Sequence, residues 1–144
     1  MSYTSWVFDS LYVLRWGDRP DVADVAAYSG EIAAASKAQG KPLVGLIIMP
    51  PSSAAPDENF RKAQAKHLPG IFTNLDYAIC VFEGTGFFAA VKRSALLAIL
   101  MVSRKRFPVY VRSTIEDALL RDPPKPLPFD AARIVAELQQ QVAA

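Results

Sequence analysis

Two short apolar runs constrain the fold of this 144-residue chain more than any other feature. Leu43 to Met49 reads LVGLIIM, and Asp76 to Phe82 contains the run YAICVF. Each run is too short to form a helix of its own, and neither alternates between apolar and polar side chains. Such runs are typical of strands that are covered on both faces of a parallel sheet. We therefore expect the two segments to be central strands of an α/β fold.

The segments around these runs predict the remaining elements. Tyr3 to Trp16 is rich in aromatic and branched side chains and is interrupted at Asp9-Ser10, which predicts an opening β-hairpin. A further strand is predicted from Phe107 to Arg112, followed by a short helix with a capping box from Ser113-Thr114 to Glu116. Longer helices are predicted from Val22 to Gly40, after Asp57 with a kink or split at Pro69-Gly70, from Phe87 to Arg106, and from Asp130 to Val142. This order predicts a mainly parallel sheet of four to five strands, with an antiparallel N-terminal hairpin and helices packed on it.

Length and composition narrow the class of protein. We expect one domain over residues 1–144, with a core over 3–121 and a proline-rich connector and C-terminal helix over 122–144. A hydrophobic content of 51% and a lone cysteine exclude a disordered chain and a disulfide scaffold. The net charge of +2 does not favour a nucleic-acid partner. The N-terminus lacks a signal-peptide pattern and no apolar run reaches about 18 residues, so we expect a cytoplasmic protein without membrane contact.

In its order of elements the chain resembles the STAS domain, the fold of the SpoIIAA-like anti-sigma-factor antagonists. The resemblance covers residues 3–121 and is carried by the hairpin, the helix ending in Gly40 and the strands LVGLIIM, YAICVF and VYVR. It implies a STAS-like sandwich and a non-catalytic signalling module that works through protein–protein contact or as a homodimer. In that family a partner kinase phosphorylates a serine in the loop after the first of these strands. The resemblance therefore implies that Ser52 or Ser53, in the loop MPPSSAAPDEN, is a phosphoacceptor.

The turn Glu83-Gly84-Thr85-Gly86 leaves a second function open. It follows a predicted strand and opens a predicted helix, a context in which free backbone N–H groups can hold an anion. The other interpretation is a tight turn in which Thr85 caps the helix. As an alternative function, the chain is a small-ligand or nucleotide-binding domain that uses Gly84, Thr85, Gly86 and Arg93, at the sheet edge where open α/β sheets bind ligands.

The stretch between Glu83 and Glu116 contains no acidic residue. Its six basic residues are Lys92, Arg93, Arg104, Lys105, Arg106 and Arg112. Either Arg104, Lys105 and Arg106 stabilise a helix C-terminus, or the stretch faces an acidic protein partner. Leu97 and Leu100 lie in an almost entirely apolar half-helix, which packs under the sheet or forms a homodimer interface. The predicted interaction surface is therefore Leu97, Leu100, Arg104, Lys105 and Arg106, and a structural subunit of a larger assembly is a further alternative.

Groups that could support catalysis have simpler structural explanations. Three carboxylate pairs lie at predicted helix starts, where negative charge stabilises the helix dipole: Asp21/Asp24, Asp57/Glu58 and Glu116/Asp117. His67 is the only histidine, and Cys80 has apolar neighbours in a predicted strand, which excludes a two-histidine metal site and argues against a Cys/His nucleophilic pair. We expect no metal, no cofactor and no enzymatic activity.

Overall fold

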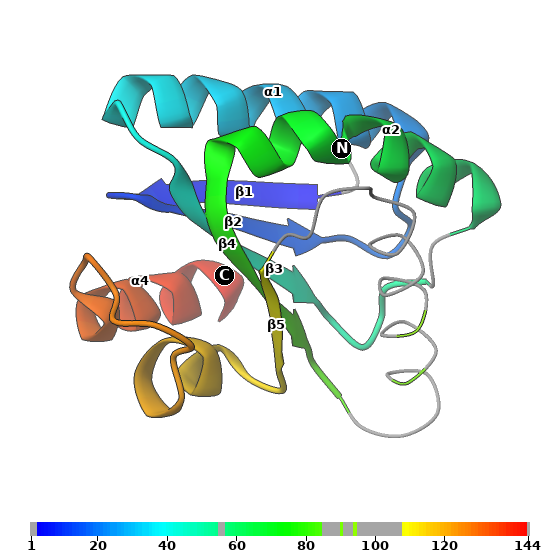
Figure 1. The fold of residues 1–144 in the computed structure, drawn as a ribbon. Helices are drawn as coiled ribbons and strands as arrows, with labels where there is room; N and C mark the ends of the chain where they lie inside the picture. The colour runs from blue at the N-terminus through cyan, green and yellow to red at the C-terminus, as the bar shows by residue number, and fades with distance from the viewer. Residues whose placement is uncertain (1–2, 55–56, 85–89, 91–93, 95–107, 144) are drawn as a thin grey trace.

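A five-stranded sheet forms the centre of the computed structural model, which describes residues 3–54, 57–84, 90, 94 and 108–143 (Figure 1). Its strands are β1 (Tyr3–Phe8), β2 (Leu11–Trp16), β3 (Leu43–Met49), β4 (Leu75–Phe82) and β5 (Val109–Arg112), and they lie side by side in chain order. β1 and β2 form an antiparallel hairpin, whereas β2, β3, β4 and β5 pair in parallel. The predicted α/β fold, with a mainly parallel sheet and an N-terminal hairpin, is confirmed.

Helices cover both faces of this sheet (Figure 1). The long helices α1 (Val22–Gln39) and α2 (Glu58–Asn74) lie on one face, and the short π-helix η1 (Asp117–Arg121) and α4 (Ala131–Ala143) lie on the other. Two hydrophobic clusters fill the spaces between sheet and helices. β3 contributes Leu43 and Met49 to the cluster under α1 and α2, and Leu46 and Ile48 to the cluster against α4. This strand is therefore buried on both faces, as its unbroken apolar run predicts.

The helix ends confirm the structural interpretation of two carboxylate pairs. Asp21 precedes α1 and accepts a hydrogen bond from the Ala23 backbone N–H at 2.9 Å, and Asp57 caps α2 in the same way. Gly40 ends α1 with a positive φ of 71°, a conformation that costs a glycine little. These two aspartates stabilise helix starts, which is the role expected of carboxylates there.

Two local predictions differ from the structure. The predicted split of α2 at Pro69-Gly70 is wrong, because the helix continues through the proline and the buried side chains of Leu68 and Ile71 hold it to the sheet on either side. The predicted kink at this point stays a prediction. The capping box is displaced by one residue, since the Thr114 hydroxyl accepts from the Asp117 backbone N–H at 3.0 Å. Glu116 instead accepts a hydrogen bond from Gln139 of α4, which joins the start of η1 to the last helix.

One carboxylate joins the edge of the sheet to α1. Glu31 accepts hydrogen bonds from the hydroxyls of Tyr3, Ser5 and Tyr12, and thereby links β1 and β2 to the helix above them. The pKa values of Tyr3 and Tyr12 are raised above the ordinary value of a tyrosine. Burial is the larger cause, and the nearby Glu31 carboxylate adds to it. These hydroxyls therefore stay protonated at neutral pH and act as donors. The sequence did not indicate this cluster, because Glu31 lies in a helix whose acidic residues are expected to face water.

We expect Glu31→Ala to lower the free energy of unfolding by about 2–3 kcal/mol, because the buried hydroxyls of Tyr3 and Tyr12 then lose their acceptor. Urea denaturation followed by circular dichroism measures this change. The control is Glu137→Ala on α4, which removes an exposed pair with Arg133 and costs about 0.3–0.5 kcal/mol. Equal losses in the two variants would contradict the structural role of Glu31.

Candidate functional site

The loops after β2 and β3 are joined at the edge of the sheet where the parallel strands end. The Ser53 hydroxyl donates to the Gly17 carbonyl at 2.6 Å, and the Ala54 backbone N–H donates to the Asp18 carbonyl at 2.7 Å. Gly17 and Asp18 follow β2 directly, and Ser53 and Ala54 belong to the loop after β3. Residues 53 and 54 of the second loop are therefore tied to the first loop by two hydrogen bonds.

The turn after β4 packs against the same loop. The Glu83 backbone N–H donates to the Met49 carbonyl at 3.0 Å. Gly84 has a φ of 92°, and a Cβ atom at this position would lie 3.1 Å from the Pro51 side chain. Both the backbone conformation and the contact with Pro51 thus require glycine. The two candidate loops of the sequence, around Ser52 and around Gly84, do lie together at this edge.

The adjacent serines of the loop have different surroundings. Ser53 is 3% exposed, its hydroxyl is used in the contact with Gly17, and its backbone N–H donates to the Pro50 carbonyl at 3.1 Å. Ser52 is exposed to solvent. A kinase must place the acceptor hydroxyl in its own active site, which Ser53 permits only if the loop opens. Of the two predicted phosphoacceptors, Ser52 is the one that the structure leaves accessible.

We expect Ser53→Ala to lower the free energy of unfolding by about 1–2 kcal/mol, because the Gly17 carbonyl loses its buried donor. Ser52→Ala is the matched control, and it changes the stability by less than about 0.5 kcal/mol because the side chain is exposed. Thermal and urea unfolding of both variants measure the difference. A Ser53 variant as stable as the Ser52 variant would show that the loop is not held by this hydroxyl.

The other predicted site residues lie outside the described residues. They are Thr85, Gly86, Arg93, Leu97, Leu100, Arg104, Lys105 and Arg106. Gly84 is the only part of the candidate ligand-binding set that the structure describes. The anion-binding interpretation of the turn, the basic surface for an acidic partner and the homodimer interface therefore stay predictions.

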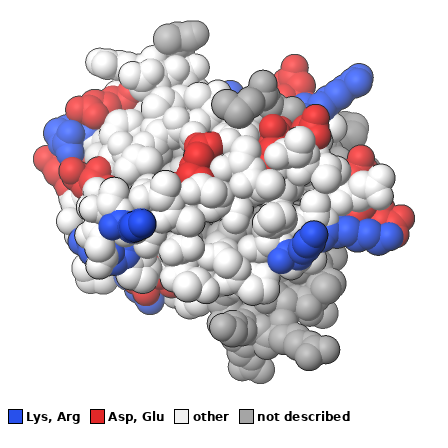
Figure 2. All heavy atoms as spheres, turned by 90° about the horizontal axis from the view of Figure 1, so that it is seen from above, with Lys and Arg blue, Asp and Glu red and all other residues white. Residues whose placement is uncertain are grey.

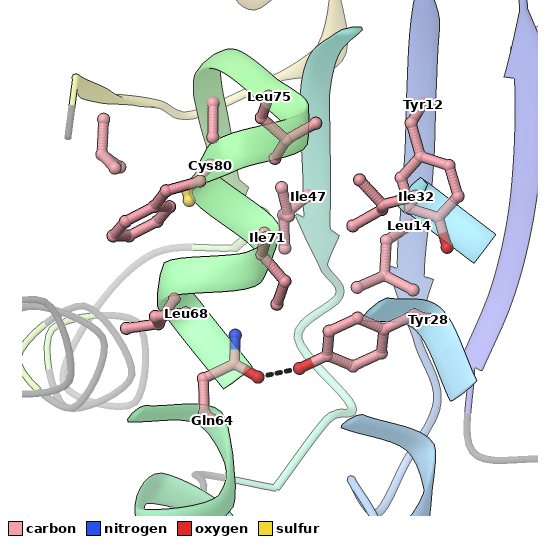
Figure 3. Close-up of a pocket in the computed structure, with 13 residues that line it drawn as sticks. Tyr12, Leu14, Tyr28, Ile32, Ile47, Gln64, Leu68, Ile71, Leu75 and Cys80 are labelled. Carbon is pink, nitrogen blue, oxygen red and sulfur yellow. Dashed lines mark hydrogen bonds between the residues drawn. The ribbon is translucent and has the colours of Figure 1, made fainter. Parts of the chain in front are cut away.

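The cavity between α1, α2 and the sheet is too small for an organic ligand (Figure 3). Its volume is about 60 Å³, whereas sites for small molecules usually measure roughly 300–1,000 Å³. Apolar side chains such as Ile47, Leu68 and Ile71 form most of its wall, and the Tyr28 hydroxyl donates to the side-chain oxygen of Gln64 across it. This cavity is a gap in the packing that links two helices through one polar contact.

Cys80 also borders this cavity, and its environment opposes a nucleophilic role. The thiol is buried, and burial raises its pKa to about 12. The reactive thiolate is therefore almost absent at neutral pH. This agrees with the sequence-based interpretation of Cys80 as a small hydrophobic residue within a strand.

We expect Cys80 in the native protein to react with a disulfide reagent at pH 8 at least about 100-fold more slowly than in denaturant, because reaction requires local opening of the fold. Absorbance of the released thiolate follows the reaction. Rapid modification of the folded protein would contradict both the burial of the thiol and its raised pKa.

The surface formed by α1 and α2 carries no continuous field of one charge in the part that the structure describes (Figure 2). Acidic and basic side chains are dispersed among uncharged ones, partly because α1 exposes alanines at positions 23, 26, 27, 33 and 34. A nucleic-acid interface needs clustered cations to neutralise phosphates. This face therefore does not provide one.

Neither a metal-binding cluster nor a membrane-spanning helix is found in the described ranges. They contain no group of three or more histidine, cysteine, aspartate or glutamate side chains that could hold a metal ion. None of their helices is both long and apolar enough to cross a bilayer. The expected absence of an enzymatic activity stays a prediction.

A groove of about 390 Å³ lies at the opposite edge of the sheet, where the parallel strands begin. Its wall is formed by Ser10, Lys41, Pro42, Val44, Asp76, Tyr77, Lys125, Pro126 and Pro128. Sequence reasoning missed this groove, since Tyr77 lies in a run that predicts a buried strand and Lys125 lies in a connector. No local pattern relates the two residues, and only the tertiary fold brings them together.

No family model matches the chain, and no curated protein sequence matches it. The α/β fold therefore rests on the structure itself. The resemblance to STAS domains stays a prediction that depends on the order of the elements.

Proposed function

We propose that the protein is a non-catalytic regulatory module that binds a protein partner through the loops at the carboxyl ends of its parallel strands, with Ser52 as the phosphoacceptor. The proposal follows from the resemblance to STAS domains. The observation that carries it is the contrast between the exposed Ser52 and its neighbour Ser53, which is buried and hydrogen-bonded to Gly17. The loop thus presents one hydroxyl to solvent from a fixed position.

A loop held in this way favours binding to a partner. The contacts of Ser53 with Gly17 and of Ala54 with Asp18 order the backbone that follows Ser52 before any partner arrives. Ordering a loop on association costs free energy, so a preorganised loop retains more of the interaction energy as affinity. Binding residues are commonly placed on loops that a rigid scaffold positions, as the sheet does here.

Phosphorylation of Ser52 would change the charge of this edge without breaking a contact that holds the loop. A phosphate adds about 1.5–2 negative charges at neutral pH. Asp18 and Glu83, on the two neighbouring loops, already carry negative charge at the same edge. The modified edge would be more negative and would carry a charge that a partner must desolvate, so we expect phosphorylation to release a partner that binds the unmodified form.

Incubation of the purified protein with ATP and an extract of its native cells tests the phosphoacceptor. Intact-mass analysis should show one added phosphoryl group on the wild type and on Ser53→Ala, and none on Ser52→Ala. Each variant replaces one serine of the same loop by alanine, so each controls for the effect of the substitution itself. No phosphoryl group, or one that persists in Ser52→Ala, would contradict the proposal.

Docking is tested with the partner captured by the wild-type protein. We expect Ser52→Asp to weaken its binding at least about fivefold, as measured by surface plasmon resonance, because the substitution adds negative charge at the docking edge. Gln140→Glu adds the same charge on an exposed position of α4 and should leave the affinity unchanged. Equal weakening in both variants would show that the loss of affinity comes from the net charge of the protein and not from the docking edge, which would contradict the proposal.

A further inference from the structure

The groove at the amino ends of the parallel strands is larger than the gap under α1 and α2. Its volume of about 390 Å³ lies within the range of small-molecule sites. Four parts of the chain meet there: the β1–β2 turn at Ser10, the entry to β3 at Lys41–Val44, the start of β4 at Asp76–Tyr77, and the connector before α4 at Lys125–Pro128. The proline-rich connector, which separates η1 from α4, thus forms one wall of a concave site.

The charges that face this groove sum to a single positive charge. Lys41 and Lys125 are cations, and Asp76 is an anion, so the balance of the wall is +1. The Lys125 ammonium lies 5.1 Å from the centre of the Tyr77 ring, which holds it over the aromatic face by a cation–π contact. A ligand with one negative charge would neutralise the groove.

The Tyr77 hydroxyl is the second indication of a ligand. Tyr77 is 2% exposed, and its buried hydroxyl has no hydrogen-bond partner in the part of the chain that the structure describes. Burial, followed by the charge of Asp76, raises the pKa of Tyr77, so the hydroxyl keeps its proton at neutral pH and can donate. A buried hydroxyl without a partner destabilises a fold, and an acceptor supplied by a ligand would remove that cost.

We infer that this groove binds a small organic molecule that combines one carboxylate with an apolar body. The carboxylate pairs with Lys41 and Lys125, and it accepts a hydrogen bond from the buried Tyr77 hydroxyl once the Lys125 side chain, which lies over the ring, moves aside. The apolar body packs against Pro42, Val44 and the connector prolines. This site lies at the opposite edge of the sheet from Ser52, so the inference does not depend on the proposed function.

The groove fits a carboxylate better than a phosphate. A phosphate monoester carries up to two negative charges, which exceeds the net +1 of the wall. Phosphate sites also commonly use several backbone N–H groups or an arginine fork, whereas the charged donors here are two flexible lysines. Proline and valine side chains form an apolar part of the wall, which an organic ligand can contact and an inorganic anion cannot.

Benzoate is the probe, and benzamide is its uncharged control of nearly equal shape. We expect benzoate to shift the backbone amide resonances of Lys41, Tyr77 and Lys125 in a saturable way, with a dissociation constant in the millimolar range or below. Benzamide and inorganic phosphate should bind at least about fivefold more weakly. Tyr77→Phe and Lys125→Gln should each weaken benzoate at least about fivefold, and Lys62→Gln, an exposed lysine of α2, should leave it unchanged.

The thermal stability of Tyr77→Phe separates a binding role from a structural role. Because the hydroxyl lacks a partner, its removal should leave Tm unchanged or raise it by roughly 2–6 °C in the absence of ligand. A lower Tm would show that the hydroxyl serves the fold and would overturn the inference. Absence of saturable benzoate binding, or equal binding of benzamide or phosphate, would also overturn it.

Discussion

Parallel pairing of strands that are buried on both faces is the constraint on which the rest of the structure depends. Ile48 of β3 and Val81 of β4 are fully buried against the α4 side, while Met49 and Cys80 are buried against α1 and α2. Both faces must therefore be covered, and each parallel neighbour must be reached by a crossover. A further consequence is that all loops leaving the parallel strands gather at one edge and all loops entering them gather at the other.

The sequence predicts what local patterns determine and misses what distant residues determine. The bounds of β3 and the glycine that ends α1 follow from apolar runs, capping residues and backbone preference, which act over a few positions. The predicted split at Pro69 is wrong because burial on both sides outweighs the lost hydrogen bond. Neither the Glu31 cluster nor the groove at Tyr77 has a local signal, since each joins segments that are far apart in the chain.

The serine pair shows the same limit within a candidate site. Ser52 and Ser53 are chemically identical neighbours, and their sequence context gives no reason to prefer one as a phosphoacceptor. The structure distinguishes them because Gly17, 36 residues away, supplies the acceptor for one hydroxyl. That single contact uses the Ser53 hydroxyl within the fold and leaves the neighbouring Ser52 exposed to solvent.

The tyrosine hydroxyls allow a comparison that favours a ligand in the groove. Tyr12 and Tyr28 are buried to a similar extent as Tyr77, yet their hydroxyls donate to Glu31 and Gln64. Other buried donors without a partner in the described residues are Arg15 Nε and Trp16 Nε1, but neither residue lines the groove. Of these three residues, Tyr77 is the one that lines the groove, and Lys125 lies over its ring. Because β3 spans roughly 20 Å between the two edges, the Ser52 loop and this groove can act as separate sites on one rigid sheet.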